Sequence, residues 1–201
     1  MIPGEYYHIY NHANGNENLF LEEKNYFFFL DKLSIHILPV AKVHAYCLLP
    51  NHFHLLISIR DFTEIKLLES FKTFQKLPLE KLQPVIEKKI SKSFSNLFSS
   101  YTQSFNKVYS RIGSLFIPNM KSILIEDESG ICKVTYYIHA NPVHHRFVRF
   151  MGDWKWSSYN SYLSEAETKL SKVEILHIFG SKEYFINYHK QPVELKYKWD
   201  V

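Results

Sequence analysis

Two strand-like runs, residues 42–49 and 52–59, are separated only by Pro50 and Asn51. Short apolar runs that are bounded by turn residues are typical of β-strands. Proline has a fixed φ angle and asparagine can bond to its own backbone, so both residues are favoured in tight turns. The sequence therefore predicts a β-hairpin in this region, and with it an antiparallel sheet.

Strand-like and helix-like segments alternate along the rest of the chain. Further strands are expected at residues 6–11 and 122–125. The expected helices, several with apolar residues at intervals of three and four, are residues 22–38, 93–112, 129–140, 172–179 and 182–188. Interleaved helices and strands with a hairpin predict an α+β fold, in which helices cover mainly one face of an antiparallel sheet.

Helix-breaking residues set the expected ends of these helices. Pro39, Gly113 and Pro142 are each expected to end the helix that precedes them. Residues 63–92 combine a helical pattern with prolines, and short helices are expected there.

Length and cysteine usage limit the class of protein. The chain has 201 residues, which fits one domain with at most a short appendage. Cys47 and Cys132 form no CxxC pair and offer no disulfide framework, so a reducing, cytoplasmic setting is expected. No signal peptide is visible at the N-terminus, and no apolar run reaches the roughly 18 residues of a membrane span.

Basic residues are concentrated in one part of the chain. Residues 88–125 contain no Asp or Glu. The basic residues of this stretch are Lys88, Lys89, Lys92, Lys107, Arg111 and Lys121. Such a distribution attracts phosphate groups, although a solvated helix face would show the same pattern.

His52-Phe53-His54 lies at the start of the second hairpin strand. Residues i and i+2 of a strand point to the same face, so the two imidazoles would converge on one point. That arrangement supplies half of a site for a divalent cation. The alternative is two unrelated histidines at the end of a hairpin.

Tyr137 and Asn141 stand four residues apart on an expected helix and would share one face. An amide oxygen is a suitable ligand for Mg²⁺ or Mn²⁺, and a tyrosine beside it would be placed to attack phosphorus. The alternative is a buried tyrosine with an asparagine at a helix end. Pro142 loosens the spacing argument, because the residue before a proline is biased away from helical geometry.

These parts fit one reaction. A phosphodiester resists anionic attack, and a divalent cation neutralises its oxygens. A tyrosine hydroxyl has an ordinary pKa of about 10, so it needs a nearby cation to become a nucleophile. The covalent product keeps the energy of the cut bond and allows rejoining without ATP. Tyr136 is a rival nucleophile, but it lies about 100° around the helix and does not stand four residues before Asn141.

Residues 45–57 (AYCLLPNHFHLLI) resemble the HUH motif of REP-associated tyrosine transposases, which are relatives of the insertion-sequence two-hundred-like enzymes. Three further stretches match in order. They are residues 7–14 (YHIYNHAN), residues 100–116 (SYTQSFNKVYSRIGSLF) and residues 137–143 (YIHANPV), and the last is followed by residues 154–159 (WKWSSY). The resemblance covers residues 5–163 and implies a transposase domain over 1–163 with a short helical extension over 164–201.

The resemblance also assigns roles. It implies a ferredoxin-like fold with His52 and His54 on a central strand as metal ligands, Tyr137 on a facing helix as the nucleophile, and Asn141 as a third ligand. The expected cofactor is Mg²⁺ or Mn²⁺, and the expected partner is single-stranded or hairpin DNA that is cut through a 5′-phosphotyrosine. Family members act as monomers or as homodimers, and no membrane partner is expected.

The expected DNA contacts come from the basic stretch. Lys107, Arg111 and Lys121 are candidate phosphate ligands, and Tyr101 is a candidate platform for unpaired bases. The family often has arginine where His12 stands, and it has a different turn where residues 144–146 stand.

Two other interpretations stay open. A relative of these transposases that binds hairpins without cutting them would keep the fold and lose the chemistry. A structural zinc protein would use Cys47 beside the histidine pair. The remaining histidines are expected to be ordinary packing or surface residues, and these are His8, His36, His44, His139 and His177.

Overall fold

The computed structural model describes residues 1–61, 64 and 79–192. The short helices that were expected before residue 79 lie outside the described residues, apart from residue 64, and so does the end of the C-terminal extension after residue 192.

The centre of the fold is a four-stranded sheet with the order β2-β3-β1-β4. The strands are β1 (Tyr6–His12), β2 (Ala41–Leu49), β3 (His52–Ile59) and β4 (Lys121–Ile125). Every neighbouring pair is antiparallel. The predicted hairpin is β2–β3, and β3, which carries His52 and His54, is a central strand as expected.

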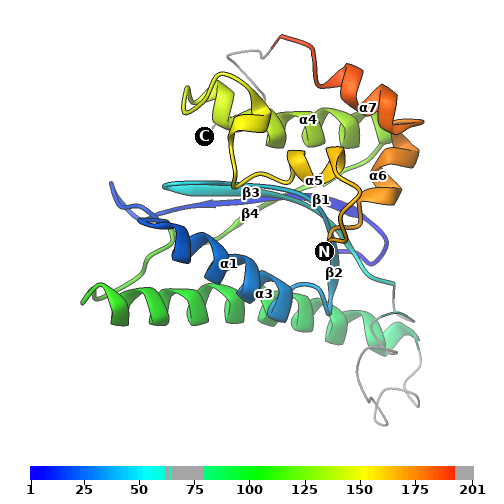
Figure 1. Ribbon diagram of the computed structural model, residues 1–201. Helices are drawn as coiled ribbons and strands as arrows, with labels where there is room; N and C mark the ends of the chain where they lie inside the picture. Colours follow the sequence, from blue (N-terminus) through cyan, green and yellow to red (C-terminus); the bar gives the residue numbers. More distant parts are fainter. Residues whose placement is uncertain (62–63, 65–78, 193–201) are drawn as a thin grey trace.

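Helices lie on both faces of this sheet. Helix α1 (Glu23–His36) connects β1 to β2, helix α3 (Leu79–Val108) leads into β4, and the two lie together on one face (Figure 1). Helix α4 (Glu128–His144) covers the other face with the shorter α5 (Tyr159–Leu163), α6 (Lys172–Ile178) and α7 (Lys182–Tyr188). A 3-10 turn, Met151–Asp153, precedes α5. The α+β class and the ferredoxin-like sheet are confirmed.

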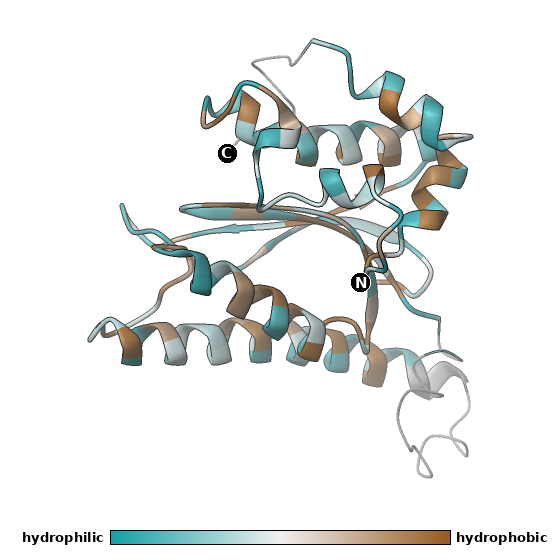
Figure 2. Cartoon of the chain, in the orientation of Figure 1, coloured by the Kyte–Doolittle hydropathy of each residue, from teal (hydrophilic) through white to brown (hydrophobic). Residues whose placement is uncertain are grey.

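Both faces are covered because both carry apolar side chains. Phe53, Leu55 and Ile57 of β3 belong to the core beneath α1 and α3. The alternate positions of β2 and β3, among them Cys47 and Leu56, belong to a second core beneath α4. Hydrophobic residues, brown in Figure 2, recur along the helices of both layers. The sequence led us to expect helices mainly on one face. That arrangement would have left the apolar side chains of the second core exposed to water.

Helix α4 passes through Pro142 and ends at His144, so the expectation that Pro142 closes the helix is wrong. Only the last turn follows the proline, and its missing N–H removes a single intrahelical bond. The carbonyl of Asn141 accepts from His145 N at 3.0 Å, and that of Pro142 accepts from Phe147 N at 2.9 Å. Tyr137 and Asn141 therefore keep their one-turn spacing.

Helix α3 also departs from expectation, since it is one helix from Leu79 to Val108 and includes Pro84. It ends before residue 112 because Ser110 adopts a left-handed φ of 52° and the Arg111 N–H bonds back to Asn106 O at 2.9 Å. Arg111 is thus outside the helix.

The C-terminal helices pack on α4. Ile175 of α6, Phe185 of α7 and Tyr162 of α5 are buried in the same hydrophobic cluster as Val134 and Tyr137. No helix in the described part of the chain is long and apolar enough to cross a membrane.

Candidate active site

The β1–β3 pairing gathers histidines on the α4 face of the sheet. His52 is the Cα partner of His12, and His54 is the partner of Tyr10. Because side chains alternate along a strand, His8, Tyr10 and His12 share the face of His52 and His54. The His52 and His54 rings lie 5.2 Å apart, and the His12 ring stacks on His52 at 4.6 Å.

Sequence reasoning found the pair on β3 and missed the residues on β1. It treated His8 as a packing residue and His12 only as a departure from a family pattern. The alternation of His8, Tyr10 and His12 along one strand was a usable signal. What it lacked was the knowledge that β1 pairs with β3.

Helix α4 brings Tyr137 to the same face as the histidine pair. The Tyr137 ring lies 5.3 Å from the His54 ring with the planes at 85°, and 5.7 Å from the His8 ring. The side chain is 2% exposed. Residues that are 83 positions apart in the chain, Tyr137 and His54, therefore meet in one buried cluster.

Asn141, one turn further along α4, faces His52. Its Oδ1 atom lies 3.3 Å from His52 Nε2. Its Nδ2 atom is buried and has no hydrogen-bond partner among the described residues, and the same holds for His12 Nε2. Buried polar atoms without partners are rare in folded proteins, so these two atoms mark a place where a partner from outside the chain fits.

The contacts of His52 create an electrostatic conflict. Burial, together with the nearby His12 and His145, lowers the pKa of His52 to about 3, so the ring is neutral and carries one N–H. Nδ1 lies 2.8 Å from Asn51 Oδ1 and donates to it. Nε2 then presents a lone pair to the lone pairs of Asn141 Oδ1. This repulsion is relieved by a cation between the two atoms or by reversal of the Asn141 amide.

His54 is held in a similar way. Its Nδ1 atom lies 3.0 Å from His8 Nε2, and the two imidazoles share a hydrogen bond. Burial lowers the pKa of His8 to about 3 and that of His54 well below its usual value, so both rings are neutral. With Nδ1 engaged on both His52 and His54, Nε2 of each ring remains as the ligand atom.

The donor set fits a divalent cation with open positions. The amide oxygen is a ligand that Mn²⁺ and Mg²⁺ accept, and the two imidazole nitrogens suit a divalent transition metal better than Mg²⁺. Neighbouring ligands of an octahedral Mg²⁺ lie about 3 Å apart, close to the 3.3 Å between His52 Nε2 and Asn141 Oδ1. Among the described residues, no group of three or more His, Cys, Asp or Glu side chains is arranged to hold a metal.

The structural zinc interpretation lacks such a ligand group. Cys47 is the Cα partner of His54 and is completely buried. Burial raises the pKa of its thiol well above the ordinary value. Cys47 instead belongs to the hydrophobic core beneath α4.

Tyr136, the rival nucleophile, points elsewhere. Its hydroxyl donates to the backbone carbonyl of Gln191 at 3.0 Å, and its ring packs edge-on against Tyr188. Tyr136 thus contacts the C-terminal helix region, whereas Tyr137 contacts the histidines.

A second buried histidine pair lies on the side of α4 that faces α7. His139 Nδ1 and His189 Nε2 are 3.0 Å apart, and His139 Nε2 lies 2.8 Å from Ser158 Oγ. His189 Nδ1 donates to Phe185 O at 2.8 Å. We call these three residues, His139, His189 and Ser158, the clasp, because they tie α7 to α4 and to the segment before α5.

Two of the predicted DNA contacts have other roles. Tyr101 is 1% exposed, packs against Phe29 and donates its hydroxyl to Leu19 O at 2.6 Å. A ring without an exposed face cannot stack on bases, so that prediction is wrong. Arg111 forms a salt bridge with Glu17 and bonds to Ser114 O at 2.7 Å. Its guanidinium holds a loop together, and Arg111 lies outside the helix that carries Lys107.

The other two predicted contacts are exposed side chains. Lys107 lies at the end of α3, on the face of the sheet opposite α4. Lys121 is the Cα partner of Tyr10, so it lies on the site's own face. Of the predicted cations, Lys121 is the one whose side chain shares a face with the histidines.

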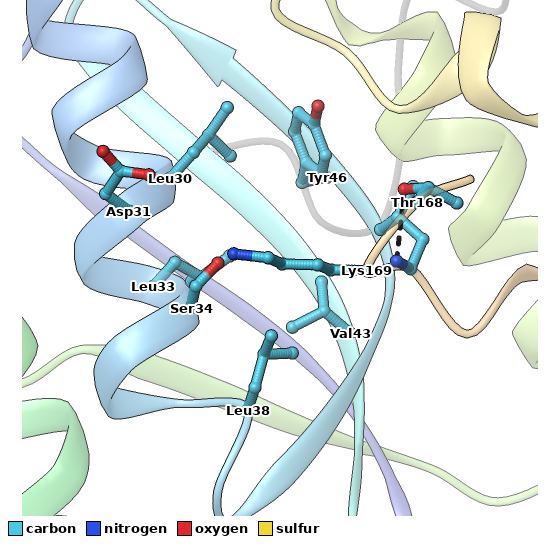
Figure 3. A pocket seen from close by; sticks show the side chains of 10 residues that line it. Leu30, Asp31, Leu33, Ser34, Leu38, Val43, Tyr46, Thr168 and Lys169 are labelled. Carbon is cyan, nitrogen blue, oxygen red and sulfur yellow. Dashed lines mark hydrogen bonds between the residues drawn. The ribbon is translucent and has the colours of Figure 1, made fainter. Parts of the chain in front are cut away.

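A hollow elsewhere on the surface is unrelated to this cluster. It is lined by α1 and β2 residues, including Leu33 and Val43, together with Thr168 and Lys169. Figure 3 shows the Lys169 side chain crossing this hollow toward α1. Val43 belongs to the core beneath α1 and α3, so the hollow is on the wrong face to reach His52 or Tyr137.

The fold resembles that of a known transposase. A solved structure of the REP-associated tyrosine transposase bound to a REP hairpin matches with a TM-score of 0.52 and 14% sequence identity, over 82% of this chain and 82% of that one. No protein-family model matches the chain, and no curated protein matches its sequence. At this identity the likeness shows a shared fold.

Proposed function

We propose that this protein is a metal-dependent tyrosine transposase that cuts and rejoins single-stranded, hairpin-containing DNA. The observation that carries the proposal is the meeting of Tyr137 with His54 and of Asn141 with His52, on one face of the sheet. The shared fold with a hairpin-bound transposase supports the choice of DNA as the substrate.

His52, His54 and Asn141 would hold Mn²⁺ or Mg²⁺, with substrate oxygens and water in the remaining positions. A bound cation would neutralise the phosphodiester oxygens and favour the phenolate of the nucleophile. Asn51 and His8 engage the Nδ1 atoms of the two histidines, which would leave Nε2 of each ring to hold the cation.

Tyr137 supplies the nucleophile. Its phenolic oxygen forms a bond to phosphorus while the bond from phosphorus to the 3′ oxygen breaks. The phenolic proton passes, in net terms, to the departing oxygen, which leaves a 3′-hydroxyl and a 5′-phosphotyrosine. Attack by a 3′-hydroxyl on the phosphotyrosine reverses these changes, releases Tyr137 and joins two strands.

The first test is the formation of a covalent adduct. Wild-type protein is incubated with hairpin-bearing single-stranded DNA and Mn²⁺, and the products are separated on a denaturing gel. We expect a protein–DNA conjugate that Tyr137→Phe reduces by roughly 10³-fold or more, because no other group replaces the nucleophile.

Tyr136→Phe is the matched control. It removes a neighbouring hydroxyl that bonds to Gln191 O, and we expect full adduct formation. A conjugate that persists in Tyr137→Phe and disappears in Tyr136→Phe would reverse the assignment. Wild-type protein that binds the hairpin with no conjugate at all would favour the alternative of a hairpin-binding protein without cleavage.

A further inference from the structure

The segment that follows α4, residues 146–150 (RFVRF), continues directly from the candidate site. The preceding residue, His145, places its ring 4.9 Å from that of His52, and the Phe147 ring lies 6.4 Å from that of His145. We call residues 146–150 the RFVRF loop. The loop therefore begins one residue after a side chain that contacts His52.

The RFVRF loop exposes large aromatic rings. Phe147 is 46% exposed and Phe150 is 71% exposed, which is unusual for phenylalanine. Phe147 rests against Trp154, with the ring centroids 5.5 Å apart, and the Trp154 indole donates to Leu48 O at 3.0 Å. Phe147 thus lies on a fixed support, and nearly half of its side chain remains exposed.

Two cations alternate with these rings. Arg146 and Arg149 are exposed, and within the described part of the chain no hydrogen bond or ion pair engages either guanidinium. Residues 129–152 contain no Asp or Glu, and the first acidic residue after the loop is Asp153. This contrasts with Arg111, whose guanidinium is paired with Glu17.

Arg146 occupies a position that glycine would fill more easily. It has a left-handed φ of 61°, and its N–H bonds to Val143 O at 2.9 Å while Phe147 N bonds to Pro142 O at 2.9 Å. This is the hydrogen-bond pattern of a helix end that normally has glycine at the left-handed residue. An arginine at this left-handed position is unfavourable for folding. Its presence therefore suggests that the side chain serves a function other than stability.

We propose that the RFVRF loop is a binding platform for single-stranded DNA, and this inference rests on the function proposed above. Bases stack on Phe150 and Phe147, and Arg146 and Arg149 pair with the adjoining phosphates. Aromatic rings interleaved with basic residues are a common means of binding unpaired strands without sequence preference. The loop guides the strand past His145 to Tyr137, a task that the buried Tyr101 cannot perform.

The decisive variant is Arg146→Gly, because its effects on folding and on binding have opposite signs. Relief of the left-handed strain should raise the melting temperature. Loss of one phosphate contact should weaken binding to a fluorescent single-stranded oligonucleotide and reduce the slope of log K against log salt by about 0.7. Binding is measured by anisotropy at several salt concentrations, and stability by thermal unfolding.

Phe150→Ser tests the stacking contact. We expect binding of the same oligonucleotide to weaken roughly 5- to 100-fold, with little change in melting temperature. Tyr184→Ser is the matched control, because Tyr184 is 69% exposed on α7 and should leave binding unchanged.

The outcomes separate the two proposals. If the wild-type protein binds the oligonucleotide and both loop variants bind equally well, the platform is overturned while the proposed function stands. If wild-type protein fails to bind single-stranded DNA, the proposed function and the platform both fall. Weaker binding by Phe150→Ser and Arg146→Gly, with Tyr184→Ser unaffected, supports the platform.

Discussion

The two buried histidine pairs of this protein have the same local chemistry, but they differ in whether the polar atoms around them all have hydrogen-bond partners. His8–His54 and His139–His189 each join two neutral rings by a hydrogen bond of 3.0 Å. The second pair is closed at both ends, because Ser158 donates to His139 and His189 donates to Phe185 O. The first pair lies beside His12 and Asn141, each of which has a buried nitrogen without a hydrogen-bond partner among the described residues.

This difference separates a structural element from a candidate site. In the clasp, every imidazole nitrogen has one donor or acceptor of the right kind, so the network only stabilises the fold. In the histidine cluster, lone pairs of His52 and Asn141 face each other, and a cation between them or reversal of the Asn141 amide is needed to resolve the conflict. A cation would bind most favourably at a network whose polar atoms lack suitable partners in the folded protein.

The largest expected effect is on acid stability, through the clasp. Burial lowers the pKa of His189 to about 4 and that of His139 well below its usual value. Below pH 6.5 or so the unfolded chain binds protons on both rings and the folded chain does not, so stability falls as the pH falls. Each histidine contributes about 1.4 kcal/mol per pH unit to this slope until its own folded pKa is reached.

A double variant measures this contribution. His139→Leu with His189→Leu should reduce the slope of unfolding free energy against pH by about 2.4 kcal/mol per pH unit between pH 6 and 5. Urea unfolding at each pH supplies the free energies. An unchanged slope would mean that the clasp histidines are protonated in the folded protein. The clasp would then not be a closed network of neutral rings.

The next effect is on metal affinity, through His8. His8→Leu removes the acceptor for His54 Nδ1, and affinity for Mn²⁺ should fall about 10- to 100-fold, as is common when the partner of a metal-bound histidine is lost. Titration calorimetry with Mn²⁺ measures it. His8→Gln keeps an acceptor oxygen and should retain most of the affinity.

His189→Leu is the control for that experiment. It breaks the other imidazole pair, so it should lower stability while leaving Mn²⁺ affinity unchanged. Equal losses of affinity in the two leucine variants would show that His8 acts only through general stability. Absence of Mn²⁺ binding by the wild-type protein would instead count against the metal site itself.

The smallest expected effect is on the unfolding free energy, through Ser158 of the clasp. Ser158 Oγ accepts from Tyr46 N at 2.9 Å and lies 2.8 Å from His139 Nε2. Ser158→Ala leaves both groups buried without that partner and should lower the unfolding free energy by roughly 1–2 kcal/mol. Adduct formation with DNA should continue. A larger loss of adduct than of stability would connect the clasp to the chemistry.

Local pattern alone was enough to predict much of this protein. Strands β2 and β3 were expected within one residue of their observed ends, because alternation and turn residues act over a few positions. The same period of two placed His52 and His54 on one face. The helical period placed Tyr137 and Asn141 together, and it survived Pro142 because only one turn follows that proline.

Contacts between distant segments were decided by the tertiary structure. His8 joined the site because β1 pairs with β3 across 46 residues, and Arg111 is paired with Glu17 across 94 residues. Tyr101 was buried because α3 packs on the sheet. Periodicity shows which side chains share a face of one element, whereas the face each element turns toward another depends on pairing and burial over the whole chain.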